Sequence, residues 1–159
     1  MRRARLALAA AAFGTAAMLG GYGEEDVAEA ATTDSARAAG AKTTKLQLRD
    51  SKFGKVLFAG NGRVLYLFTS DTAGTSNCSG ECAAAWPPFY ARGKLVAGDG
   101  VNRKLLGRTT RPDGRKQVTY KGHPLYFYVH DPRGEILCHN VNEFGGDWLV
   151  VRASGKPAP

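Results

Sequence analysis

The cysteines are the most reactive side chains of this sequence. Cys78 and Cys82 form a C-x3-C pair, and Cys138 follows in the second half of the chain. Outside the cytoplasm such a pair is normally oxidised to a disulfide. Chain entropy favours a long bridge to Cys138, worth about 4 kcal/mol, over the short bridge, worth about 2 kcal/mol, but a bridge needs Cα atoms within about 7 Å. We favour Cys78–Cys82 with a free thiol at Cys138, and the long bridge stays open.

The same sulfur atoms could instead bind a soft metal ion. With one neighbouring imidazole they would form a donor set suited to Cu(I) or Zn(II), consisting of Cys78, Cys82, Cys138 and His139. The histidines show no H-x-H, H-x3-H or H-E-x2-H spacing, and we interpret them as surface residues of turns: His123, His130 and His139. We therefore predict no metal and no cofactor, and copper bound by the four-residue set is the alternative.

Two aspartates stand at corresponding strand ends. Asp71 and Asp131 each follow a hydrophobic run that contains a tyrosine, Tyr66 in the first run and Tyr126 in the second. A facing pair of carboxylates could act as acid and base. An aspartate at a strand end more often accepts backbone N–H groups of the turn, and a buried tyrosine hydroxyl needs an acceptor. We favour the structural role. The sequence has no G-x-S-x-G elbow and no glycine-rich nucleotide motif, so we predict no enzyme.

One aromatic segment could bind a ligand, namely Trp86-Pro87-Pro88-Phe89-Tyr90. It could present an exposed platform for a sugar or a heme-like ring. We favour a different interpretation, in which the prolines form the rigid exit of a short helix and Trp86 packs into the core. The remaining candidate ligand cluster consists of Trp86, Cys138 and His139.

An internal repeat must position these residues. At an offset of 60, residues 54–78 and 114–138 share seven identities without a gap, where chance gives about one or two. The motif residues of the two copies are Tyr66, Phe68 and Asp71 in the first, and Tyr126, Tyr128 and Asp131 in the second. We infer a tandem duplication, with repeat 1 at about 54–90 and repeat 2 at about 114–151.

Each copy predicts a β-hairpin around a glycine-containing turn. The strand pairs are 55–58 with 64–68 and 117–120 with 124–128, and 148–151 forms the last strand. The second strand of each hairpin is apolar on both faces, which places it at the centre of the domain, and a pseudo-twofold axis could relate the two copies. Residues 81–86 form a short helix with Ser79 as its N-cap. The predicted fold is mostly β, an antiparallel sheet built from two pseudo-symmetric hairpin repeats.

The N-terminus reads as an export signal. Arginines at positions 2, 3 and 5 precede an uncharged Ala/Leu-rich run over 6–21, which is marginal for a membrane span because the bilayer core is about 30 Å thick. We predict a signal peptide over 1–30 with cleavage after Ala28-Glu29-Ala30, and a permanent anchor is the alternative. A flexible linker over 31–44, a single domain over 45–152 and a disordered tail over 153–159 complete the organisation.

Charge narrows the predicted partners. The chain carries a net charge of +8, and removal of residues 1–30 takes away three bases and four acids, which leaves 19 − 10 = +9. Such a field favours anionic cell-wall polymer or a membrane surface. Scattered bases and export argue against nucleic acid. The alternative is a solvated surface whose charge keeps the protein soluble.

Several motifs occur together in a recognisable order. Tyr66–Asp71 and Tyr126–Asp131 both fit Y-x-[FWY]-x-x-D, and they are accompanied by the cysteine pair 78–82, Ala85-Trp86-Pro87-Pro88 and Asn142–Trp148. Over about 55–151 the chain resembles the bacterial predicted-lipoprotein family described as a secreted repeat of unknown function. The resemblance implies an exported, usually lipid-anchored protein with two repeats, and it supports Cys78–Cys82 as a local unit. It supplies no activity and no catalytic residue.

The chain departs from this family pattern at two positions. Tyr22 stands where the lipid-bearing cysteine is usual, and a phenol cannot form the thioether, so a lipid anchor is doubtful. Cys138 lies outside the basic pattern, which keeps a long bridge or a metal role open. The Ala-rich, basic composition looks actinobacterial. We predict a non-enzymatic binding or structural module of the cell envelope, secreted or membrane-associated, and the alternative is an extracytoplasmic redox or copper-binding protein that uses Cys78, Cys82 and Cys138.

Overall fold

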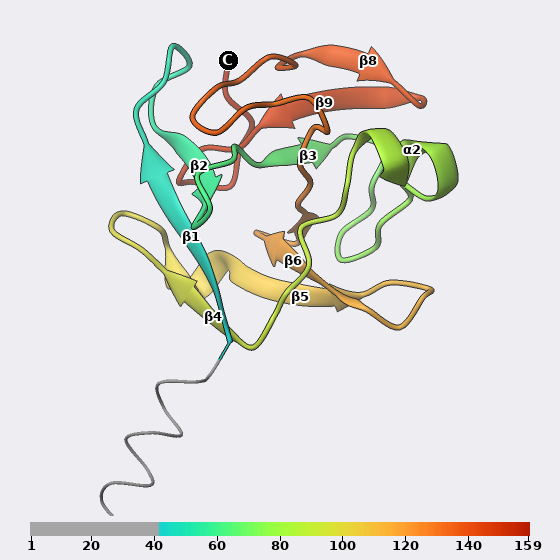
Figure 1. Cartoon of the computed structure of the whole chain (residues 1–159), viewed down its shortest axis with the longest axis horizontal. Helices are drawn as coiled ribbons and strands as arrows, with labels where there is room; N and C mark the ends of the chain where they lie inside the picture. The colour runs from blue at the N-terminus through green and yellow to red at the C-terminus, as the bar shows by residue number, and fades with distance from the viewer. Residues whose placement is uncertain (1–41) are drawn as a thin grey trace, which may run out of the picture. The chain divides into compact units, whose positions relative to one another are not determined.

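The computed structural model describes residues 42–159 (Figure 1). The predicted signal peptide, its cleavage site and nearly all of the predicted linker lie outside these residues. In this part of the chain the fold is mostly β, as predicted, with one short α-helix, α2 (Gly80–Ala85), and one 3-10 turn, η1 (Arg103–Leu105). The strands form three small sheets. Their bounds are β1 (Thr43–Arg49), β2 (Val56–Ala59), β3 (Tyr66–Phe68), β4 (Lys94–Ala97), β5 (Leu106–Thr110), β6 (Lys116–Tyr120), β7 (His123–Pro124), β8 (Val141–Glu143) and β9 (Gly146–Val150).

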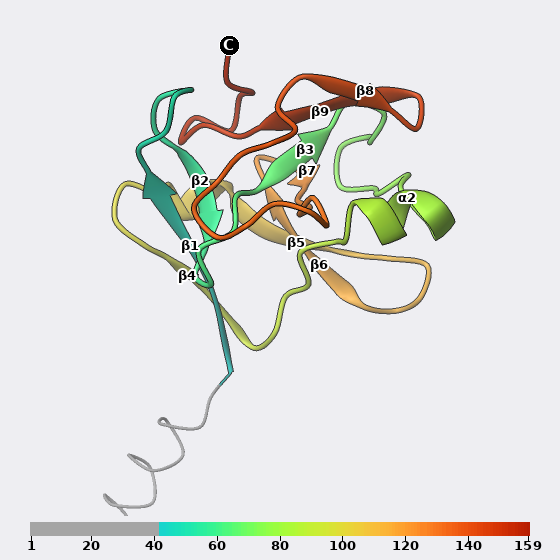
Figure 2. The same cartoon turned by 45° about the horizontal axis from the view of Figure 1, so that its top comes forward.

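The sheets combine local hairpins with exchange between the repeats. Their strand orders are β2-β1-β4, β3-β9-β8 and β5-β6-β7, and only the β1–β4 pair is parallel. Sheet β3-β9-β8 places the centre of repeat 1 beside the end of repeat 2, with Tyr66 opposite Val150. Conversely, Pro88 of repeat 1 forms a bridge with Tyr126 of repeat 2. Figures 1 and 2 both show β3 next to β9, under the β8–β9 hairpin.

Reciprocal backbone hydrogen bonds mark the pseudo-twofold axis. The Tyr66 N–H donates to the Tyr126 carbonyl and the Tyr126 N–H donates to the Tyr66 carbonyl, each at 3.0 Å. Further out, the Gly74 N–H donates to Gly122 and the Gly134 N–H donates to Gly62, each at 2.8 Å. Each bond maps onto its mate by the offset of 60, so the two repeats pack as a symmetric, intertwined pair.

Residues 43–44 and the C-terminal residues are more ordered than their composition predicts. Thr43 and Thr44, placed in the predicted linker, begin strand β1, and the buried Thr44 hydroxyl bonds both backbone groups of Arg92 at 2.6–2.8 Å. In the predicted tail, the N–H of the buried Ala158 donates to Val150 at 2.9 Å. These small residues carry no hydrophobic signal, and backbone hydrogen bonds fix them instead.

Candidate functional site

The two C-x3-C cysteines form a disulfide, as predicted. Cys78 and Cys82 are bonded with their Cα atoms 5.3 Å apart, and the bond closes the loop that leads into α2. Cys138 is the free cysteine of the described chain. It is half-buried and packs against the hydrophobic cluster that contains Cys78 and Cys82. Burial raises the pKa of the Cys138 thiol, although a hydrogen bond with Tyr128 partly opposes this. A thiol of this kind is a weak nucleophile at neutral pH.

His139 has both ring nitrogens engaged by the backbone. Its Nδ1 accepts from the Val150 N–H at 3.1 Å, so Nε2 carries the proton and donates to the Pro159 carbonyl at 3.0 Å. Among residues 42–159 no group of three or more histidine, cysteine or acidic side chains is arranged to hold a metal ion. A copper site using Cys78, Cys82 and Cys138 with this histidine would require reduction of the disulfide and rotation of the imidazole.

The two motif aspartates bind tyrosines of the opposite repeat. The Tyr66 hydroxyl donates to Asp131 Oδ2 and the Tyr126 hydroxyl donates to Asp71 Oδ2, both at 2.7 Å. Each carboxylate also accepts a backbone N–H six residues downstream, at 2.7 Å for Asp71 and 2.9 Å for Asp131. Burial raises the pKa of both phenols and of both carboxyls. These contacts hold turns and repeats together.

A cluster of aromatic rings fills the space around the axis. Trp86 and Trp148 stack with centroids 4.0 Å apart, and Phe68 stacks on the other face of Trp148 at 4.2 Å. Tyr66 and Trp86 form a T-shaped pair with ring centroids 5.1 Å apart, and Tyr126 and Trp148 form another with centroids 5.2 Å apart. Trp86 is fully buried, so it belongs to the core and offers no ligand platform.

Both buried indoles find their hydrogen-bond acceptor on one residue. Trp86 Nε1 donates to the Glu143 carboxylate at 3.0 Å, and Trp148 Nε1 donates to the Glu143 carbonyl at 3.2 Å. Glu143 ends β8, so the β8–β9 hairpin is tied to the segment after α2. Of the candidate cluster, Trp86 and Cys138 share one core, whereas His139 faces β9 and the C-terminus.

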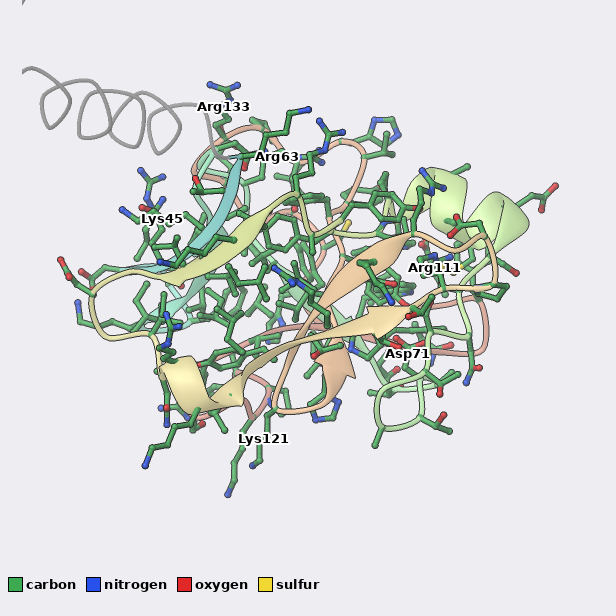
Figure 3. The ribbon with its side chains drawn as sticks, turned by 90° about the horizontal axis from the view of Figure 1, so that it is seen from below. Lys45, Arg63, Asp71, Arg111, Lys121 and Arg133 are labelled. Atoms are coloured by element: carbon green, nitrogen blue, oxygen red, sulfur yellow. A yellow bond between two sulfur atoms is a disulfide. The ribbon has the colours of Figure 1, made fainter. Side chains whose placement is uncertain are left out.

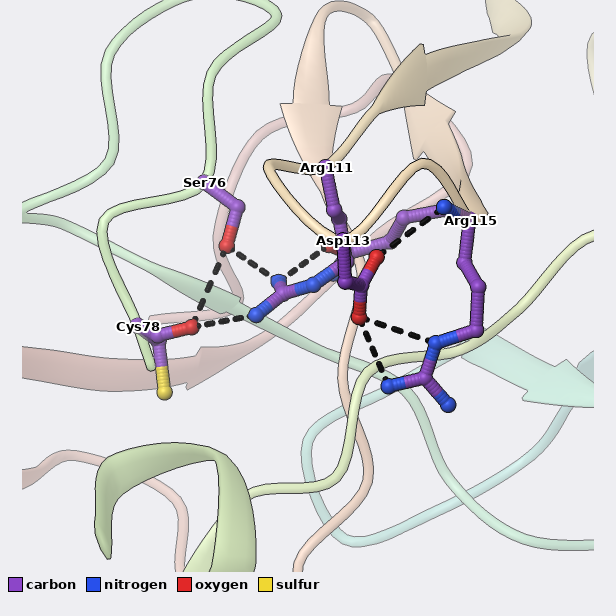
Figure 4. A network of polar contacts seen from close by, with 6 residues as sticks. Ser76, Cys78, Arg111, Asp113 and Arg115 are labelled. Atoms are coloured by element: carbon purple, nitrogen blue, oxygen red, sulfur yellow. Dashed lines mark hydrogen bonds and ion pairs between the residues drawn. The ribbon is translucent and has the colours of Figure 1, made fainter. Parts of the chain in front are cut away.

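A buried arginine directly after strand β5 organises a second polar centre (Figure 4). Arg111 is 7% exposed and donates to Ser76 Oγ at 2.5 Å, Gln117 Oε1 at 2.8 Å and the Cys78 carbonyl at 2.6 Å. Ser76 in turn bonds the Tyr126 hydroxyl at 2.6 Å. The guanidinium therefore connects the disulfide loop to the tyrosine–aspartate contact. No local sequence signal distinguishes this arginine from its exposed neighbours.

The hollow with the best claim to bind a ligand lies beside the Trp-Pro-Pro segment. It encloses about 720 Å³ between the start of β1, the turn after β2 and the segment after α2, and we call it the aromatic groove. Its lining residues are Thr43, Thr44, Lys45, Ala59, Gly60, Asn61, Pro87, Pro88, Phe89, Tyr90, Arg92 and Phe127. The segment predicted as a platform thus contributes its prolines, Phe89 and Tyr90 to the groove, although Trp86 itself is hidden.

Cations surround this groove without acidic partners. Lys45 and Arg92 line it and are exposed, while Arg63 lies 4.7 Å over the ring of Phe127 and donates to the Tyr128 carbonyl. Figure 3 shows Arg63 beside Arg133, away from Arg111 and Asp71. Within residues 42–159 the ion pairs are Lys55–Asp50 and Arg115–Asp113. Arg115 also lies 4.1 Å over the ring of Tyr90, at the rim of the groove. Aromatic side chains, prolines and cations without an ion-pair partner suit a polyol or sugar that carries negative charge.

These features define a class, a β module made of two interlocked repeats with a cationic aromatic groove at its side. The chain belongs to the family described as "Secreted repeat of unknown function", which matches residues 48–90 and 107–152. The two matched segments contain the two predicted repeats, so the duplication is confirmed. Comparison with curated proteins and with solved structures gave no match. In the described part of the chain, no helix has the length and apolar character to cross a membrane.

Proposed function

We propose that this protein is a non-enzymatic binding module of the cell envelope, and that its ligand is an anionic wall polymer held in the aromatic groove. The observation that carries the proposal is that Lys45 and Arg92 line one hollow of about 720 Å³ together with Phe127 and Tyr90. The cations attract phosphate or carboxylate, and the apolar wall accommodates the polyol or sugar between the charges. A purely solvated surface would not need this combination.

The hydrogen bonds of the Asp71 and Asp131 carboxylates support a binding role for the protein rather than a catalytic one. A catalytic acid–base pair must contact the substrate. Asp131, however, is buried, and its two carboxylate oxygens accept hydrogen bonds from the Tyr66 hydroxyl and the Leu137 N–H. Asp71 is similarly engaged by Tyr126 and the Asn77 N–H. Both groups lie at the repeat interface and neither lines the groove.

The family description, a secreted repeat, supports a location outside the cytoplasm. The proposal adds an export signal over residues 1–30, cleaved without lipid attachment because Tyr22 replaces the cysteine. The composition favours an actinobacterial source. Nucleic acid is not proposed as a ligand, since an exported protein would not encounter a genome.

Titration of the full chain with a soluble anionic wall polymer tests the function. Lys45→Gln and Arg92→Gln should each weaken binding about fivefold, which is about 1 kcal/mol, and added salt should weaken wild-type binding. Lys156→Gln is the matched control, because it removes the same charge from an exposed site outside the groove. Equal losses in all three variants, or binding that ignores salt, would contradict the proposal. Release of polymer fragments would contradict its non-enzymatic part.

A further inference from the structure

A second cationic hollow lies between the edges of β4 and β5. It is a shallow, open depression of about 800 Å³, and we call it the edge hollow. Its lining residues are Gly93, Lys94, Leu95, Arg103, Leu106, Gly107 and Arg108. The three basic residues are exposed, and the lining contains neither an acid nor an aromatic ring. The edge hollow therefore suits anionic groups rather than sugar faces.

The residues that line the edge hollow adjoin those that line the aromatic groove along the β1–β4 pair. Thr43 lines the groove and pairs in register with Lys94, which lines the hollow. Arg92 lines the groove, and the next residue, Gly93, lines the hollow. Gly93 has φ +66, and a Cβ there would lie 1.7 Å from the Lys42 carbonyl, so only glycine permits this close approach of β4 to the start of β1.

A hydrogen bond joins β5, on one side of the edge hollow, to Gly93, which lies between the hollow and the aromatic groove. Arg108 on β5 donates from Nη2 to the Gly93 carbonyl at 2.5 Å, while Lys94 and Arg103 take part in neither of the two ion pairs of the described chain. Five cations, Lys45, Arg92, Lys94, Arg103 and Arg108, thus line two adjoining hollows. Two of the three cations in the edge hollow are arginines, whose planar fork matches the oxygens of phosphate.

We infer that the groove and the hollow form one track for a single flexible phosphodiester-linked polyol chain, which places successive phosphates in both hollows. This inference rests on the proposed function and adds a second site and the repeating chemistry of the ligand. Two linked contacts on one chain make the second binding event intramolecular. Affinity should therefore grow with chain length, and a fragment that fills the aromatic groove alone should not sense the edge hollow.

The experiment compares a long poly(glycerol phosphate) with its two-unit fragment on the full chain. Wild type should bind the long chain about 100-fold more tightly than the fragment. The double variant Lys94→Gln/Arg103→Gln should lose about tenfold toward the long chain and keep wild-type affinity for the fragment. Lys52→Gln/Lys156→Gln removes the same charge elsewhere and should leave the ratio unchanged.

The outcomes separate the two proposals. Wild type that binds neither probe overturns the proposed function, and the inference with it. Binding of both probes with no chain-length effect, or an equal loss in both double variants, overturns the inference alone. Binding that is stronger to vesicles of anionic phospholipid, with the same loss in Lys94→Gln/Arg103→Gln, assigns the track to a membrane surface and also overturns the inference.

Discussion

At the scale of single residues, two hydrogen bonds between tyrosine and aspartate side chains join the two repeats. Tyr66 with Asp131 and Tyr126 with Asp71 are equivalent by symmetry, and in each contact the O···O distance is 2.7 Å. The residue types were readable from the motif, and the need of a buried hydroxyl for an acceptor was predictable. The partner was not predictable, because each tyrosine lies five residues from an aspartate of its own repeat and bonds the other one.

The pKa shifts of these aspartates predict an unusual pH dependence of stability. Burial raises the pKa of Asp131 above the ordinary 3.8, so in the interval just above pH 3.8 the folded chain binds more protons than the unfolded chain. The contribution of this group to the free energy of unfolding is then largest at low pH and falls as pH rises through that interval. Subtracting the Asp131→Asn curve from the wild-type curve in denaturant titrations should isolate this slope.

Asp113→Asn provides the opposite control. Arg115 lowers the pKa of the exposed Asp113. The small contribution of the Asp113 carboxylate to the free energy of unfolding is therefore present at neutral pH and disappears as pH falls. Asp131→Asn should also reduce stability at every pH, since an amide cannot accept both donors. A wild-type-minus-Asp131→Asn difference that increases with pH would contradict the assignment.

At the scale of elements, strand β9 of repeat 2 is held on both of its edges. It pairs with β3 on one side and β8 on the other, and Trp148 on it stacks between Phe68 and Trp86. The predicted pairing of 55–58 with 64–68 is reduced to one bridge between Phe58 and Val64, because β2 pairs with β1 and β3 pairs with β9 in a different sheet. The β6–β7 hairpin and the helix before the prolines were predictable from local pattern. Strand β4 was not, because Lys94–Ala97 is too short to show periodicity, and β1 was assigned partly to a linker by composition.

Substitution at the start of β9 tests this constraint. A Cβ at Gly146 would lie 2.4 Å from Ser70 Oγ and 2.8 Å from the Phe68 ring, so Gly146→Ala should lower the free energy of unfolding by about 1–3 kcal/mol. Thermal unfolding measures the loss. Asn142→Ala, on the exposed neighbour β8, should change stability by much less. Equal stability of the two variants would show that β9 can move away from β3.

At the scale of the molecule, both repeats contribute to each of the two hydrophobic clusters of the described chain, so the repeats cannot separate without exposing both. The end of each repeat pairs with the centre of the other, and the Trp86–Trp148 stack takes one ring from each. Residues 42–159 carry 18 bases and 9 acids, which is 18 − 9 = +9. Few of these charges form ion pairs, so a field that attracts anions persists around this part of the chain.

Separated halves of the domain test this interdependence. Peptides covering 42–98 and 99–159 should each lack a cooperative unfolding transition, because each exposes half of the shared core. Mixed in equal amounts, they should regain β-structure by circular dichroism and a near-ultraviolet signal from the stacked tryptophans. Cooperative folding of either half alone would refute the shared core.

The sequence by itself determined the duplication, the hairpin of repeat 2 and the basic character, and it favoured the local disulfide over the long bridge, because identity at a fixed offset, short spacing and strand pattern are local properties. Only the tertiary structure decided which tyrosine meets which aspartate, that Arg111 is buried, and that the aromatic groove and the edge hollow adjoin. These features depend on how the repeats cross. The groove joins segments near residues 43, 60, 88 and 127, and no local pattern encodes contacts at such separations.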